Sequence, residues 1–229
     1  DSGTFGDQCL IELRRGKSHK PPLILIHSLP GDVLGYVHLV AKLPEDQPIY
    51  GIQALGLVNP DQVHNSISEM AKYYLDVIDR HELGDSFCLG GWCFGGRVAV
   101  EMALIYRQTH KNMPLVLLFE AFAYNPISSL KLKYSLHRFK RVVQNWELIP
   151  YLLINRLRSK GKYKTNFTKE EVFQDLGIFK NRGMVRTENV NAMYGCKMVT
   201  YPGRLVLFRA TKQSHGAMQD HTLGWDVFA

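Results

Sequence analysis

The residues of this chain best suited to chemistry surround Cys93, in the stretch Gly91-Trp92-Cys93-Phe94-Gly95-Gly96. A nucleophilic side chain between glycines, after an apolar run and before a helical pattern, is typical of a nucleophile elbow. Glycine suits such a sharp strand-to-helix turn because the turn leaves almost no room for side chains. The start of a helix also favours a thiolate, so the pattern predicts a low pKa for this thiol. Cys93 is therefore the candidate nucleophile, and a buried structural cysteine is the alternative.

This stretch, with Ala99 and Glu101 after it, resembles the elbow of the thioesterase domains that end nonribosomal peptide and polyketide synthases. Serine usually stands in that family where this chain has Cys93. The resemblance covers nearly the whole chain and implies an α/β-hydrolase fold, in which helices flank a mostly parallel sheet and a helical lid is inserted. A native cysteine and an engineered replacement for serine both fit the sequence.

The resemblance also implies three other site residues. Glu120 follows an apolar run at 115–119, where the family keeps its triad acid, normally an aspartate. An ordinary carboxylate at the end of a strand is the alternative. The loop after the apolar run at 23–26 corresponds to the family's oxyanion loop. The resemblance therefore implies that the oxyanion is held by the backbone N–H of Leu29 in this loop and by that of Phe94, the residue after the nucleophile. We interpret His27, at the start of that loop, as a structural histidine.

The general base is expected outside the supplied sequence. In the family the catalytic histidine lies one strand and one loop beyond a Gly-Trp segment, which the residues at 224–225 resemble, so we expect it beyond Ala229. His215 and His221 precede this segment and are weaker candidates. The sequence thus predicts a single thioesterase domain over 1–229 that is incomplete at its C-terminus.

Apolar runs alternate with helical spacing along the chain, which predicts a mostly parallel, doubly wound sheet. The expected strands are 9–14, 23–26, 49–53, 87–90, 115–119 and 204–210. Helices are expected over 36–43, from Ser66 onward, after Cys93 and over 189–194. The core is predicted at 9–126 and 186–229, and the lid insertion at 127–185.

Composition narrows the class of protein. The length of 229 residues and a hydrophobic content of 45% suit one α/β domain. No apolar run approaches the length of a membrane span and no signal-peptide pattern opens the chain, so a cytoplasmic protein without membrane attachment is expected. The four cysteines show neither a Cys-x-x-Cys pair nor a nearby histidine cluster, so we expect no metal site and no disulfide framework.

The net charge of +7 is concentrated in the predicted lid, because residues 131–169 hold eleven lysines and arginines and one glutamate. This stretch includes Lys131, Lys133 and Lys140. Steering of an acidic carrier protein and a solvated helical face are equally good explanations. Nucleic-acid binding is the least favoured reading, because no recognition motif accompanies the charge.

The predicted function is release of an acyl or peptidyl chain from the phosphopantetheine arm of a carrier protein, through an acyl-Cys93 intermediate. Aminolysis, cyclisation or hydrolysis would end the reaction, and the carrier domain is expected in the same parent chain. No cofactor is expected beyond the phosphopantetheine that presents the substrate. The alternatives are a proofreading or stand-alone hydrolase and, from another class, a catalytically silent carrier-docking domain.

Overall fold

The computed structural model describes residues 9–17, 19–123, 181–197, 199–210 and 222–228. The chain divides into two compact units, one of 1–124 with 177–229 and the other of 125–176. All the described residues belong to the first unit. The predicted lid lies mostly outside them, as does the whole basic stretch, and the lid's role stays a prediction.

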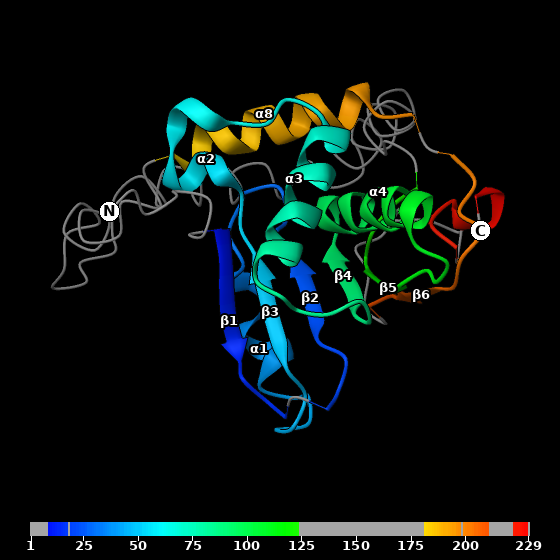
Figure 1. Ribbon diagram of the computed structural model, residues 1–229. Helices are drawn as coiled ribbons and strands as arrows, with labels where there is room; N and C mark the ends of the chain where they lie inside the picture. The colour runs from blue at the N-terminus through cyan, green and yellow to red at the C-terminus, as the bar shows by residue number, and fades with distance from the viewer. Residues whose placement is uncertain (1–8, 18, 124–180, 198, 211–221, 229) are drawn as a thin grey trace, which may run out of the picture. The chain divides into compact units, whose positions relative to one another are not determined.

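A six-stranded sheet forms the centre of the first unit (Figure 1), in the order β1-β3-β2-β4-β5-β6. The strands are β1 (Leu10–Arg14), β2 (Leu23–Ile26), β3 (Ile49–Ile52), β4 (Cys88–Trp92), β5 (Leu115–Phe119) and β6 (Leu205–Phe208). Only β1 at the edge is antiparallel to its neighbour, and the remaining pairs are parallel. The predicted mostly parallel sheet is confirmed.

Strand β2 shows why helices cover both faces of this sheet. All four of its residues are buried, as expected of a central strand, and successive side chains point to opposite faces. Ile24 and Ile26 belong to a core cluster with α3 (Ile67–Arg80) and α4 (Phe94–Thr109). Leu23 and Leu25 belong to a second cluster, against which residues of the short helix α1 (Val37–Val40) pack.

Helix α3 begins at the predicted position, with half of the expected capping box. The Ser66 hydroxyl accepts a hydrogen bond from the Glu69 N–H at 3.2 Å. The Glu69 carboxylate accepts from the N–H of Asn65, not from that of Ser66. One hydroxyl bond to the first turn is enough to satisfy one of the donors that a helix start leaves open.

Helix α4 begins directly after Cys93 as predicted, whereas the remaining helices differ from the sequence-based boundaries. The expected helix at 36–43 is a 3-10 turn, η2 (Leu34–Tyr36), followed by α1. Further short elements are α2 (Leu55–Val58), η3 (Pro60–Gln62) and η6 (Trp225–Val227). No helix among the described residues is long and apolar enough to cross a membrane.

Helix α8 (Arg182–Gly195) is longer than predicted and starts within the expected lid boundary. It lies alongside α2, at the end of the sheet toward which the parallel strands point (Figure 1). The carboxyl ends of parallel strands are where α/β folds place their sites. Helix α8 is therefore close to the predicted site.

Candidate functional site

Cys93 stands at a sharp turn between β4 and α4. Its φ of +54° lies in the left-handed region, which residues other than glycine rarely adopt. A Cβ atom on Gly91 would lie 2.1 Å from the carbonyl carbon of Gly95, closer than any real contact. The turn therefore depends on the absence of side chains at its flanks, and the predicted strand-turn-helix is confirmed.

The electrostatics of the thiol differ from expectation. Burial raises the pKa of Cys93, and the backbone N–H of Phe94 and the charge of Arg97 oppose this rise without cancelling it. The pKa of Cys93 is therefore raised and not lowered as predicted, because loss of water around the sulfur outweighs these two opposing effects. The resting thiol keeps its proton near neutral pH, so attack by its sulfur requires a base.

The loop that carries Leu29 meets the start of α4 at the carboxyl end of β2. A Cβ on Gly95 would lie 2.4 Å from the Ile26 carbonyl oxygen and 2.5 Å from that of His27. The predicted donors Leu29 and Phe94 thus belong to two backbone segments in close contact. Within the described part of the chain, neither N–H donates to a backbone carbonyl.

Helix α8 holds this loop from the other side. The Asn189 amide, 1% exposed, donates to the Leu29 carbonyl at 2.9 Å. Arg182 forms an ion pair with Asp32, which is 7% exposed. The loop beside the nucleophile is therefore fixed by side chains about 150 to 160 residues later in the chain.

Glu120 follows β5, directly beside the nucleophile strand. The Cys93 N–H donates to the Phe119 carbonyl at 2.9 Å, so the two candidate residues follow adjacent strands. The Glu120 carboxylate accepts a hydrogen bond from the N–H of Ala210, which follows β6. Glu120 also has a positive φ, of 47°. The carboxylate is thus tied to the chain that follows β6.

The histidines considered as weaker bases, His215 and His221, lie outside the described residues. The Gly-Trp segment that follows them is described, and the Trp225 indole N–H donates to the Ala121 carbonyl at 2.8 Å. This bond joins the segment to the backbone next to Glu120. The catalytic histidine stays a prediction.

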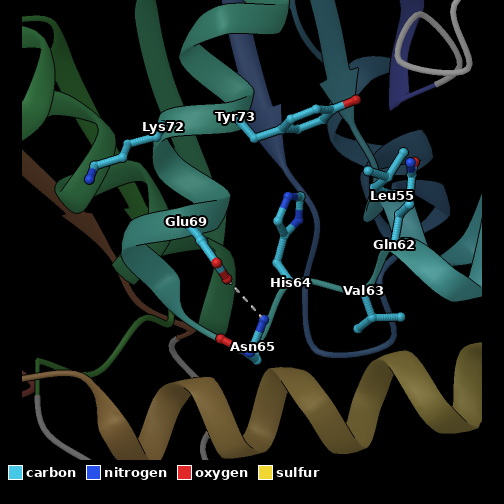
Figure 2. Close-up of a pocket in the computed structure, with 8 residues that line it drawn as sticks. All are labelled: Leu55, Gln62, Val63, His64, Asn65, Glu69, Lys72 and Tyr73. Carbon is cyan, nitrogen blue, oxygen red and sulfur yellow. Dashed lines mark hydrogen bonds between the residues drawn. The ribbon is translucent and has the colours of Figure 1, made fainter.

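A pocket of about 430 Å³ lies beside the first turns of α3 (Figure 2). It is lined by Leu55, Gln62, Val63, His64, Asn65, Glu69, Lys72 and Tyr73. The His64 ring lies below Tyr73, with 5.0 Å between ring centroids, and edge-on to Tyr74 at 6.0 Å. Lys72 points away from this ring. Burial lowers the pKa of His64.

The described residues contain no group of three or more His, Cys, Asp or Glu side chains that could hold a metal ion. All four cysteines are free thiols. The chemical groups at the site are a thiol, a carboxylate and backbone N–H donors. These suit acyl transfer, in which a nucleophile attacks a carbonyl and an oxyanion must be held.

Sequence reasoning missed the groups that position the oxyanion loop. The Tyr74 hydroxyl on α3 forms a hydrogen bond with His27 Nε2, a pairing that no local pattern predicts. A phenol in an apolar core needs a hydrogen-bond partner, and this need is a usable signal. Asn189 is a buried amide and carries the same signal, whereas nothing in the sequence marks Asp32 or Arg182 as partners.

The chain is similar to several known proteins. Residues 21–126 match the family model "Thioesterase domain". Malpibaldin synthetase of Mortierella alpina is 36% identical over 114 residues, which are 49% of this chain and 2% of the synthetase. A probable thioesterase of Gibberella zeae is 36% identical over 99 residues, covering 43% of this chain and 24% of that protein.

The fold has a counterpart of known structure. A crystal structure of a four-domain nonribosomal peptide synthetase bound to AMP and glycine has a TM-score of 0.71 to this chain, with 22% identity. The match covers 96% of this chain and 18% of the synthetase. The chain thus spans a small part of these relatives. Together the matches support a thioesterase domain of the nonribosomal peptide and polyketide synthase type, and they indicate an enzyme with an α/β-hydrolase fold.

Proposed function

We propose that this chain accepts an acyl or peptidyl group from the phosphopantetheine thiol of a carrier protein onto Cys93, and then releases it. The observation that carries the proposal is Cys93 itself, at positive φ between β4 and α4. The relatives include whole synthetases, so we place the carrier in the same parent protein.

The first half-reaction is exchange of one thioester for another. The sulfur of Cys93 attacks the carbonyl carbon, and the base takes the thiol proton. The bond from that carbon to the pantetheine sulfur then breaks, and the base returns the proton to the departing thiolate. Because burial raises the pKa of Cys93, little thiolate is present without the base.

The base would be the histidine that we expect beyond Ala229, oriented by Glu120. The hydrogen bond from the Ala210 N–H fixes the carboxylate, which suits the role of an orienting acid. The N–H groups of Leu29 and Phe94 would hold the tetrahedral oxyanion. No metal or redox cofactor is required by this sequence of steps.

Release would follow by attack of water, an amine or a hydroxyl group on the acyl-Cys93 thioester. A thioester keeps more of its reactivity toward nitrogen than an oxoester does, so a cysteine suits aminolysis or closure of a strained ring. Changing Cys93 to serine should therefore shift the products toward the hydrolysed acid, or cause acyl-enzyme to accumulate. An unchanged product ratio and rate would argue against a special role for sulfur.

The central test uses a small acyl thioester and intact-mass measurement on the full-length protein. We expect a mass increase of one acyl group that Cys93→Ala abolishes and the matched control Cys88→Ala keeps. Cys88 is suitable because it is a partly buried thiol at the start of β4, the strand that leads to Cys93, five positions earlier. Absence of acylation in the unaltered protein would instead favour the silent docking domain.

A second variant tests the acid. Glu120→Gln keeps an oxygen that accepts from the Ala210 N–H but removes the charge. We expect acylation to slow by up to about 10⁴-fold, the order observed when a triad acid loses its charge. Acylation at the unaltered rate would show that the orienting acid is another residue.

A further inference from the structure

His27 is the first residue of the oxyanion loop (27–32), and the hydrogen bonds of its ring determine its tautomer. The ring is 0% exposed, with Nδ1 2.8 Å from the Ser28 carbonyl oxygen and Nε2 2.7 Å from the Tyr74 hydroxyl. A carbonyl oxygen only accepts, so Nδ1 carries the proton. Burial lowers the pKa of His27 to about 4, so the ring is neutral near pH 7 and Nε2 accepts from Tyr74.

Tyr74 is a suitable donor for that bond. Its side chain is completely buried, and burial raises the pKa of its phenol far above the physiological range. The hydroxyl therefore keeps its proton and donates a hydrogen bond to Nε2. Tyr74 thus fixes the tautomer in which Nδ1 faces the loop with a proton.

The bond from His27 acts on the peptide that carries the Leu29 N–H. The Ser28 carbonyl accepts both from His27 Nδ1–H and from the Gly31 N–H, the second at 2.9 Å. In a planar trans peptide the carbonyl and the N–H point in opposite directions. Fixing the Ser28 carbonyl on one side therefore fixes the direction of the Leu29 N–H on the other.

We infer that His27, held by Tyr74, is a positioning residue that aims the Leu29 N–H at the oxyanion of the acyl-transfer reaction. The inference rests on the proposed function of Cys93. It differs from the usual chemical role of histidine, because both ring nitrogens are already engaged. The Phe94 ring also lies against the imidazole, with 5.9 Å between centroids. His27 is thus a donor to the loop and does not act as the general base.

Two substitutions separate the nitrogens of the ring. In His27→Asn the amide nitrogen takes the place of Nδ1 and can still donate to the Ser28 carbonyl. In His27→Gln the amide reaches the place of Nε2, so the hydrogen bond to the Ser28 carbonyl is lost. We expect Gln to lower the acylation rate constant 10- to 100-fold with an unchanged KM, and Asn to stay within about threefold, because only Gln disturbs an oxyanion donor.

The measurement is made on the full-length protein with a small acyl thioester. Alkylation of Cys93 by iodoacetamide serves as the internal control, since it forms no oxyanion, and we expect the same rate in both variants. Thermal unfolding shows that each variant is folded. Equal losses with Asn and Gln in folded protein would overturn the positioning role.

A second pair of variants tests the support from α3. Tyr74→Phe removes the donor to Nε2, and we expect a loss of three- to tenfold in acylation. Tyr73→Phe is the matched control, because it removes a neighbouring hydroxyl that interacts with Cys9. Equal effects of the two would contradict the role of Tyr74.

Nitrogen-15 NMR of histidine reads the tautomer directly in the unaltered protein. We expect protonated Nδ1 and bare Nε2, and a proton on Nε2 would overturn the inference. If acylation is absent although Nδ1 is protonated, the proposed function fails and the positioning role fails with it. If acylation occurs and His27→Gln has no effect, the positioning role alone fails.

Discussion

Two backbone segments meet at the carboxyl edge of the sheet, and they are held in different ways. The nucleophile turn at 92–96 is fixed by backbone packed directly on backbone, with no room for a Cβ at Gly91 or Gly95. The oxyanion loop at 27–32 is fixed by side chains that arrive from α3 and α8. The turn is thus fixed by contacts between backbones, at Gly91 within the turn itself and at Gly95 with Ile26 and His27, whereas the loop is held by distant side chains.

This difference has a consequence for how each segment fails. Steric contact between backbones cannot be relieved by rotating a side chain, so a single added methyl group disturbs the turn. The loop has several independent hydrogen bonds, each of modest net value, so removing one leaves the others. We expect the turn to be intolerant of substitution and the loop to lose its geometry by degrees.

The largest effect is expected from Gly95→Ala. The added Cβ would lie 2.4 Å from the Ile26 carbonyl oxygen. Neither atom can move away without moving its backbone. We expect the free energy of unfolding to fall by at least about 3 kcal/mol, measured by denaturant titration. Gly183→Ala in α8, with nothing within 4 Å, is the control and should be neutral or stabilising by up to about 1 kcal/mol. Similar stability for the two variants would contradict the steric account of the turn.

The pH dependence of stability should distinguish the loop from the turn. The folded protein holds the pKa of His27 at about 4, below its ordinary value of 6.5, so only the unfolded state gains this proton between these values. The contribution of neutral His27 to the free energy of unfolding is thus complete above about pH 6.5. It is lost as the pH falls to 4, by about 3 kcal/mol in total. Asp32 and His64 act on His27 in opposite directions, with Asp32 raising and His64 lowering its pKa.

The check is to compare unfolding of the unaltered protein and of His27→Asn between pH 7 and pH 5. We expect the unaltered protein to lose about 2 kcal/mol more than the variant over this range. Parallel curves for the two proteins would show that His27 is not held neutral.

A smaller effect is expected from Asn189→Ala. The substitution leaves the Leu29 carbonyl without its amide donor in a partly buried place, which costs about 2 kcal/mol. Asn191→Ala on the same helix is the matched control, because its amide is exposed, and it should change stability by less than about 0.5 kcal/mol. Equal unfolding midpoints would show that α8 does not support the loop through this bond.

The smallest effect is expected from Arg182→Gln. Arg182 is about one third exposed and Asp32 keeps a hydrogen bond from the Leu34 N–H, so we expect a loss of about 1 kcal/mol. The loss should shrink at 1 M salt, where such pairs are screened. Arg186→Gln, at an exposed position of the same helix, is the control. A loss that is independent of salt would indicate that packing, and not charge, is responsible.

The outcome at Cys93 shows where local reasoning was sufficient and where it was not. The glycine pattern predicted the turn because the steric requirement at Gly91 involves Gly95 and Gly96, four and five positions later. The pKa of the thiol was predicted in the wrong direction, because burial depends on the whole surrounding fold. Position along the chain revealed the helix dipole but not the loss of water.

The sequence by itself determined the six strands and the helices after Ser66 and Cys93, because apolar periodicity, glycine positions and the Ser66 cap act over a few residues. It thereby predicted Cys93 at a turn, and the family resemblance implied Glu120 as the acid at the end of a strand. The sequence did not predict the short elements α2, η3 and η6. The tertiary structure alone decided which buried polar groups meet, namely Tyr74 with His27 and Asn189 with Leu29. The reason is physical: a buried donor must find an acceptor wherever the fold supplies one, and sequence distance places no limit on that choice.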